Sequence, residues 1–183
     1  LDGPWATRVA AAAQATGVHV VAGMFTPAAD GRVRNTLLVT GPTGGGDEIH
    51  TGYDKIHLFD AFGFLESDTV APGTEPRVLR LGDFGVGLAT CYDVRFADQF
   101  TALGRAGAQL VVLPASWGEG PGKAEQWDFL VAARAHDAQA WLLACDQAWT
   151  PPRGKAALGI GRSALLDPSA GPGHPEPPPP TPP

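Results

Sequence analysis

Apolar residues in this chain come in short runs, and amphipathic stretches lie between them. Four of the runs are almost continuously apolar, as expected of strands that are buried on both faces: 18–25, 84–91, 108–115 and 140–148. Three less continuously apolar runs also predict strands: 33–40, 77–81 and 160–167. The turn "DGR" separates the first strand from 33–40, so the two together predict a hairpin.

The longer stretches have the composition and spacing of helices. Residues 5–16 are rich in alanine and end at Gly17, and residues 96–106 fit a helix between two strands. A third helix is predicted at 123–138, where one apolar face carries Trp127, Leu130, Val131 and Arg134. Strands that alternate with helices predict an α/β fold in which helices cover the sheets.

The length of 183 residues predicts one domain, which we assign to residues 1–170. Within it, residues 59–76 look irregular because Pro72, Gly73 and Pro76 break regular structure. Residues 171–183 contain no apolar side chain except proline, which predicts a disordered or polyproline tail.

Charge and composition narrow the class of protein. The net charge is −6 and no basic patch stands out, which argues against nucleic acid or a membrane surface as a partner. No apolar run is long enough to cross a bilayer and no signal peptide is evident. Two cysteines do not make a disulfide framework, so we expect a reducing cytoplasm.

Several kinds of site are not supported by the sequence. The glycine-rich "GPTGGGDE" lacks the Lys-Ser/Thr pair of a phosphate loop, and "GDFGVGLAT" lacks the third glycine of a dinucleotide fingerprint. His50 and His57 are too loosely placed for a metal site, and neither cysteine has a CxxC partner. No G-x-S-x-G nucleophile elbow is present. We therefore expect no metal, nucleotide or serine-hydrolase chemistry.

Cys91 is the last residue of the predicted apolar strand 84–91, and the polar residues Tyr92, Asp93 and Arg95 follow at once. One interpretation is a small buried residue that ends a core strand, which is the usual fate of a free cysteine. The other is a reactive thiol, because sites in open α/β sheets form outside the carboxyl ends of strands. Cys145 lies in "WLLACDQA" without such a polar break, so we predict that it belongs to the core.

Lys55 and Glu66 are charged residues with apolar neighbours. Lys55 stands in the extended stretch "GYDKIHLFD", and Glu66 in "FLES" is close to Phe62 and Phe64. A solvated strand lysine and a loop-capping glutamate are the ordinary interpretations. Partial burial would instead require the ammonium to have a partner or a function.

Taken in order, these blocks resemble a known family. The stretches "GYDKIHLFD", "FLES…VAPGTEP", "FGVGLATCYDVRFAD", "VVLPASW" and "QWDFLVAARA" are similar to those of the nitrilase (carbon–nitrogen hydrolase) superfamily. The resemblance covers nearly all of residues 1–168, and within the family it is closest to small aliphatic amidases of the omega-amidase type.

The resemblance implies a fold, a chemistry and a set of site residues. The fold is an αββα sandwich that pairs into homodimers or larger homo-oligomers, and no cofactor is needed. Cys91 matches the nucleophile, Lys55 the catalytic lysine and Glu66 the second glutamate, which positions substrate and lysine. The backbone N–H of Tyr92 matches an oxyanion-hole donor, and Trp117 matches a position beside the substrate pocket.

The implied reaction is hydrolysis of a small linear amide, with or without a carboxylate, to an acid and ammonia through a cysteine thioester. A nitrile or carbamoyl-amide hydrolase could use the same residues, and a non-catalytic interaction module could keep the same scaffold.

One departure from the family pattern bears on activity. The family's general-base glutamate would fall before Leu1, the C-terminal hairpin is replaced by prolines, and the only methionine is Met24. We therefore expect a domain that is truncated at both ends and weakly active or inactive as written.

Overall fold

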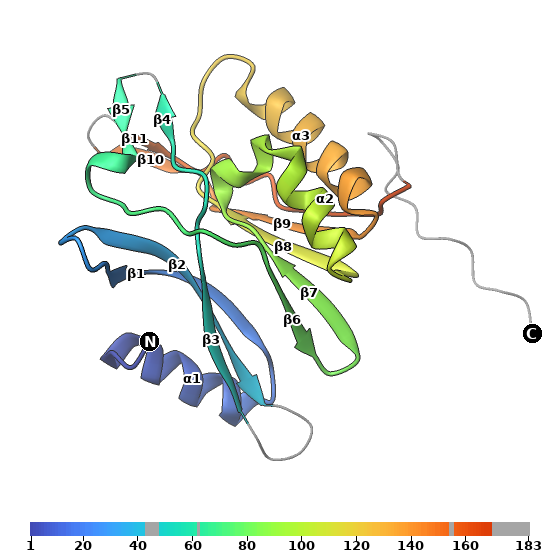
Figure 1. The fold of residues 1–183 in the computed structure, drawn as a ribbon. Helices are drawn as coiled ribbons and strands as arrows, with labels where there is room; N and C mark the ends of the chain where they lie inside the picture. The colour runs from blue at the N-terminus through green and yellow to red at the C-terminus, as the bar shows by residue number, and fades with distance from the viewer. Residues whose placement is uncertain (43–47, 62, 154–155, 170–183) are drawn as a thin grey trace, which may run out of the picture.

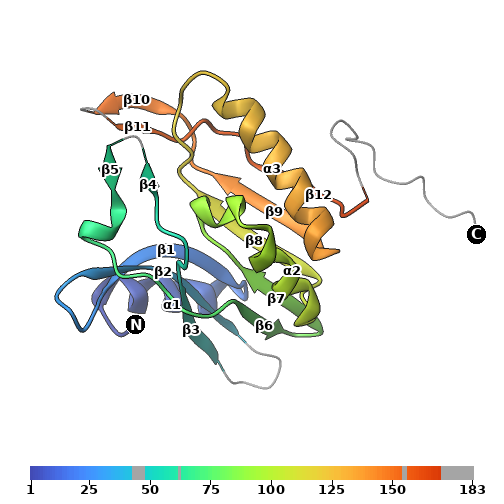
Figure 2. The ribbon, with the colours of Figure 1, turned by 45° about the horizontal axis from the view of Figure 1, so that its top comes forward.

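The computed structural model describes residues 1–42, 48–61, 63–153 and 156–169, which form four layers in the order helix, sheet, sheet, helix (Figures 1 and 2). Helix α1 (Pro4–Thr16) covers the outer face of a three-stranded sheet. Helices α2 (Ala97–Arg105) and α3 (Lys123–Ala138) cover the outer face of a five-stranded sheet. This arrangement confirms the predicted αββα architecture.

The smaller sheet is a three-stranded antiparallel meander. It contains β1 (Val20–Pro27), β2 (Val33–Pro42) and β3 (Glu48–Asp54) in the order of the chain. The β1–β2 pair confirms the predicted hairpin, and Gly31 supplies the positive φ of +85° that its turn requires.

The larger sheet combines a parallel centre with antiparallel edges. Its strand order is β12-β9-β8-β7-β6. These strands are β6 (Arg77–Leu81), β7 (Phe84–Leu88), β8 (Leu110–Ala115), β9 (Trp141–Asp146) and β12 (Ala164–Leu166). β7, β8 and β9 run parallel, so their carboxyl ends open at one edge of the sheet.

Short elements fill the connections. The stretch predicted to be irregular contains β4 (Asp60–Ala61), β5 (Phe64–Leu65) and the 3-10 turn η1 (Glu66–Asp68). A second 3-10 turn, η2 (Cys91–Arg95), follows β7. β10 (Thr150–Arg153) and β11 (Ala156–Leu158) form another small antiparallel pair.

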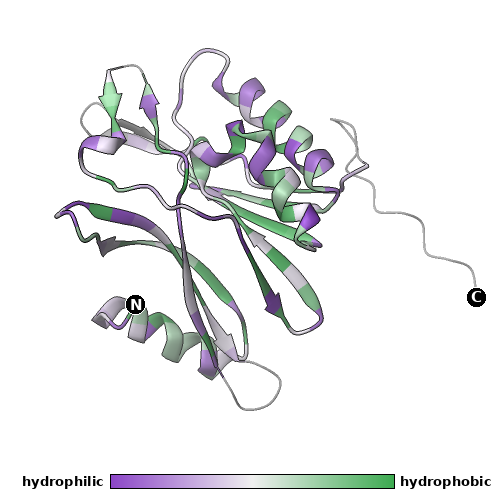
Figure 3. Ribbon diagram, viewed as in Figure 1, coloured by the Kyte–Doolittle hydropathy of each residue, from purple (hydrophilic) through white to green (hydrophobic). Residues whose placement is uncertain are grey.

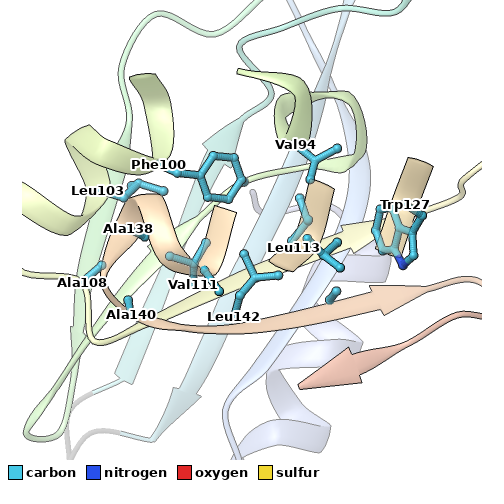
Figure 4. Close-up of a cluster of buried hydrophobic side chains, with 14 of the residues drawn as sticks. Val94, Phe100, Leu103, Ala108, Val111, Leu113, Trp127, Ala138, Ala140 and Leu142 are labelled. Atoms are coloured by element: carbon cyan, nitrogen blue, oxygen red, sulfur yellow. The ribbon is translucent and has the colours of Figure 1, made fainter. Parts of the chain in front are cut away.

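Two apolar clusters hold the layers together, and the apolar residues along the strands and helices can be followed in Figure 3. One cluster lies under α2 and α3, where Phe100, Leu103, Trp127 and Leu142 are fully buried (Figure 4). The other lies between the sheets and joins Leu37, Val39 and Tyr53 to Val86, Leu88 and Val112. On the large sheet this cluster is built from β7 and β8, with Leu79 and Leu81 of β6 packed against it, and it includes no described residue of β9.

The position of Cys145 corrects our prediction that it lies in the core. It is exposed, while its neighbours Ala144 and Asp146 are buried. Side chains alternate along β9, so Cys145 points away from the face that α3 covers. The apolar run around it did not reveal which of its residues face the helix.

Residues 171–183, for which we predicted a tail, lie outside the described residues. Among the helices that are described, none is both long and apolar enough to span a membrane.

Candidate active site

Cys91 stands at the carboxyl edge of the large sheet in a strained backbone conformation. β7 ends at Leu88, three residues before Cys91, and Cys91 is the first residue of η2. This corrects the prediction that the strand continues to Cys91. Its φ is +47°, a left-handed conformation that costs a side-chain-bearing residue about 1–2 kcal/mol.

Hydrogen bonds around the turn hold this conformation in place. The Asp93 carboxylate accepts the Thr90 N–H at 2.8 Å, and the Asp93 N–H donates to the Thr90 carbonyl at 3.0 Å. Backbone strain that the surroundings maintain is typical of functional sites. The turn presents the Cys91 side chain to a pocket instead of continuing the strand.

Lys55 and Glu66 form a buried ion pair. Lys55 Nζ lies 2.6 Å from Glu66 Oε2, and the two side chains are 3% and 11% exposed. Glu66 also accepts the Phe59 N–H at 2.7 Å and, at 3.4 Å, the side-chain amide of Asn35. The structure thus excludes the solvated strand lysine and gives Glu66 a partner beyond a loop cap.

Both residues line a pocket of about 820 Å³ together with Cys91 and Trp117. The walls come from both sheets and the loops at their edge, and they are mainly apolar. The lining residues are Gly23, Met24, Phe25, Asn35, Leu37, Lys55, Phe59, Phe64, Glu66, Thr90, Cys91, Pro114, Ala115, Ser116, Trp117, Gly118, Lys123 and Gln147. A mainly apolar cavity with a few converging polar groups is typical of small-molecule sites.

Tyr92 is not among these lining residues. Its ring packs edge-on against Phe59 at 5.1 Å and against Phe96 at 5.7 Å. Its backbone N–H belongs to the first turn of η2, where helical N–H groups have no partner within the helix. The oxyanion role of this N–H stays a prediction.

Burial raises the pKa of the Cys91 thiol above its usual value. The positive charge of Lys55 and a backbone hydrogen bond from Ser116 oppose this shift, while Glu66 and Asp93 add to it. Lys55 is therefore the main charge that favours the thiolate, and the sequence had not singled out Ser116.

A second lysine faces the same pocket. Lys123 begins α3, and its Nζ lies 5.2 Å from the centre of the Trp117 ring and 5.9 Å from that of Phe59. Burial lowers the pKa of Lys123, and the neighbouring charge of Arg95 lowers it further. Lys123 therefore places a partly desolvated positive charge on the pocket wall.

Asp146 is another site residue that the sequence did not reveal. It is 7% exposed at the end of β9, and it accepts the Trp117 N–H at 2.8 Å and the Ile160 N–H at 2.9 Å. It thereby fixes the loop that brings Ser116 and Trp117 to the pocket. The usable signal was an acidic residue at the end of an apolar run, and Asp93, two residues after the run 84–91, is a similar case.

No group of three His, Cys, Asp or Glu side chains within the described ranges could hold a metal ion. What the pocket offers is a thiol, an ammonium paired with a carboxylate, and backbone N–H groups. These groups suit nucleophilic attack on an electrophilic carbon, with stabilisation of the negative charge that develops.

Comparisons with known proteins agree with this chemistry. Residues 1–170 match the family model described as carbon–nitrogen hydrolase. A Mycobacterium tuberculosis protein described as a hydrolase is 50% identical over 171 residues, which are 93% of this chain and 60% of the relative. A deaminated glutathione amidase from Escherichia coli is 34% identical over 92% of this chain and 60% of its own length. The chain thus spans about 60% of the length of these relatives.

Solved structures share the fold. A Saccharomyces cerevisiae member of branch 10 of the nitrilase superfamily superposes with a TM-score of 0.76 at 23% identity, covering 89% of this chain and 57% of that one. An amidase from Nesterenkonia superposes with a TM-score of 0.73 at 25% identity, covering 89% and 58%. In that structure the acetamide moiety of fluoroacetamide is bound covalently to the active-site cysteine. The chain belongs to the carbon–nitrogen hydrolase family.

Proposed function

We propose that this chain carries the nucleophile and the lysine of an amidase that converts small linear amides to a carboxylic acid and ammonia. The observation that carries the proposal is the convergence of Cys91 with the buried Lys55–Glu66 pair in one pocket. The names of relatives as amidases, among them an omega-amidase from Xenopus tropicalis at 30% identity, support the choice of amides.

The proposed reaction begins with attack of the Cys91 thiolate on the amide carbon, which forms a C–S bond and moves one electron pair onto the oxygen. Lys55 Nζ–H and the Tyr92 N–H stabilise this oxyanion. Each donor of this kind is typically worth about 3 kcal/mol of barrier. Glu66 holds the ammonium in place. Collapse of the intermediate breaks the C–N bond, and a proton delivered to the nitrogen lets ammonia leave.

Water then attacks the thioester, breaks the C–S bond and returns the thiol. Both halves of the reaction need a general base, which activates the thiol and later the water. Among the described lining residues, Glu66 carries the only carboxylate, and it already accepts hydrogen bonds from Lys55 and the Phe59 N–H. We therefore expect slow turnover by the 183 residues alone.

The positive charge of Lys123 on the pocket wall favours one class of amide substrate. An ammonium that is partly desolvated beside Arg95 is stabilised by an anion. We accordingly propose that the preferred amides carry a carboxylate at their far end, and that Lys123 contacts it.

An ammonia-release assay tests the proposed function. We expect slow release from succinamate by the chain, acceleration by added formate acting as an external base, and neither with Cys91→Ala. Equal release by the chain and by Cys91→Ala would refute an amidase that uses Cys91 and would favour a non-catalytic module. A benzonitrile or carbamoyl substrate that is turned over faster would favour the alternative hydrolase classes.

A further inference from the structure

We propose that Asp93 is a positioning residue that fixes Lys55 relative to Cys91 by binding the chain on both sides of the lysine. The inference rests on the proposed roles of Cys91 and Lys55. It concerns a carboxylate that stands behind the pocket wall and is not one of its lining residues.

Asp93 is completely buried and is surrounded by hydrogen-bond donors. Its Oδ2 accepts the Thr90 N–H at 2.8 Å and the Tyr53 hydroxyl at 2.7 Å. Its Oδ1 accepts the His57 N–H at 2.9 Å and His57 Nδ1 at 3.0 Å. A buried carboxylate needs such donors, because it has no water to solvate it.

The donors to Asp93 come from the two chain segments that carry Cys91 and Lys55. Thr90 immediately precedes Cys91, whereas Tyr53 and His57 stand two residues before and two residues after Lys55. A single side chain therefore ties the turn that carries the thiol to the segment that carries the ammonium. The bonds span 36 and 40 positions in sequence, so no local structure could replace them.

The two side-chain donors are themselves held in orientation. Gln99 Nε2 donates to the Tyr53 hydroxyl at 2.8 Å, so the hydroxyl hydrogen is directed to Asp93. The His57 ring stacks on Phe96, with centroids 3.6 Å apart and an interplanar angle of 7°. Pre-organisation of this kind is what a positioning network requires.

If these bonds were lost and Lys55 moved away from Cys91, the change could be measured as the pH at which the Cys91 thiol loses its proton. Lys55 is the main charge that favours the Cys91 thiolate, so a Lys55 that withdraws should leave the thiol protonated to higher pH. Removing Asp93 itself would confuse the result, because its negative charge acts on Cys91 in the opposite direction. The informative variants therefore keep Asp93 and remove its donors.

The experiment measures the pH profile of Cys91 alkylation by iodoacetamide, in which the sulfur bonds to carbon and iodide leaves. All proteins carry Cys145→Ser, so that only one thiol reacts. His57→Phe keeps a ring to stack on Phe96 but removes the Nδ1 donor, and Tyr53→Phe removes the hydroxyl. We expect each of these two substitutions to raise the midpoint of the alkylation pH profile by about 0.5–1 pH unit. This is a fraction of the 1–3 pH units by which a nearby cation lowers the pKa of an acidic group.

Two controls separate positioning from general destabilisation. His57→Asn places an amide N–H where Nδ1 stood, and it should restore most of the original midpoint. Thr40→Val removes a buried hydroxyl at the far end of the β2–β3 pair, where it bonds His50 and Glu48. It should lower the melting temperature without moving the midpoint.

A double-mutant cycle with Lys55→Met decides the inference. We expect Lys55→Met to raise the midpoint by itself, and His57→Phe to add nothing in that background. The positioning role is overturned if His57→Phe shifts the midpoint equally with and without Lys55, or shifts it no more than Thr40→Val does. If Lys55→Met alone leaves the midpoint unchanged, the proposed role of Lys55 fails, and the positioning role fails with it.

Discussion

Replacing Glu66 by glutamine tests whether the Lys55–Glu66 ion pair is as shielded from solvent as its geometry indicates. The variant keeps the shape of the side chain but leaves the Lys55 ammonium without its counter-charge. The paired atoms are 2.6 Å apart and the side chains are 3% and 11% exposed, so little water can take over. Removing one partner of a buried pair costs about 3–5 kcal/mol. We expect about 3 kcal/mol, because the glutamine oxygen still accepts one hydrogen bond.

Urea unfolding followed by tryptophan fluorescence measures this loss. With a slope of about 2 kcal/mol per molar urea, the midpoint should fall by about 1.5 M. The matched control is Glu125→Gln, the same change at an exposed position of α3, which should alter the free energy of unfolding by less than about 0.5 kcal/mol.

The double variant Lys55→Met/Glu66→Leu sharpens the test. It removes both charges and leaves no uncompensated ammonium, so it should be more stable than Glu66→Gln alone. If Glu66→Gln lowers the free energy of unfolding no more than Glu125→Gln does, the ion pair is solvated. A buried lysine held by Glu66 would then be wrong.

Three further predictions concern other parts of the chain. Lys123→Met should raise the KM for succinamate more than tenfold and leave that for the uncharged analogue butyramide within about twofold, as steady-state assays would show. Burial holds the pKa of Cys91 above the 9.0 of a free thiol, so the folded chain keeps that proton longer than the unfolded chain. The free energy of unfolding should therefore fall as the pH rises above 9, and Cys91→Ala should make that decline smaller in urea titrations without abolishing it, because burial also raises the pKa of Cys145 and of Tyr53. In Gly104→Ala the new Cβ would run into the Ala138 carbonyl where α2 meets α3, so calorimetry should show a loss of about 1–3 kcal/mol.

Much of the fold could be predicted from the apolar pattern. Helix 123–138 has the predicted bounds, and strand 77–81 is also found as predicted. The continuous runs at 84–91, 108–115 and 140–148 contain the three parallel strands. Burial on both faces was wrong for β9, in which Trp141 and Cys145 are exposed, and for the run 18–25, because β1 lies at the edge of its sheet and Phe25 is exposed.

The predicted ends of elements were less accurate. The predicted strand continues to Cys91, yet the observed strand ends at Leu88 and the backbone is left-handed at Cys91. That turn depends on Asp93, whose other donors come from residues 53 and 57. The sequence around Cys91 does not show hydrogen bonds that come from distant segments, so the turn could not be predicted.

The same limit applies to the site. Lys55, Glu66 and Cys91 were singled out because charged or polar residues interrupted apolar stretches, and the structure places all three in one pocket. Ser116 acts through its backbone, so its residue type gave no comparable signal, and the acidic residue Asp146 at the end of an apolar strand was a signal that we did not use.

The most direct test of the account is where fluoroacetamide reacts, because this weak electrophile distinguishes an activated thiol from an exposed one. Cys91 is partly buried and Cys145 is exposed, so accessibility alone favours Cys145. Peptide mapping of the chain treated at alkaline pH should find the acetamide adduct on Cys91 and not on Cys145, and Lys55→Met should greatly reduce it. An adduct mainly on Cys145, or one on Cys91 that does not depend on Lys55, would contradict the proposed active site.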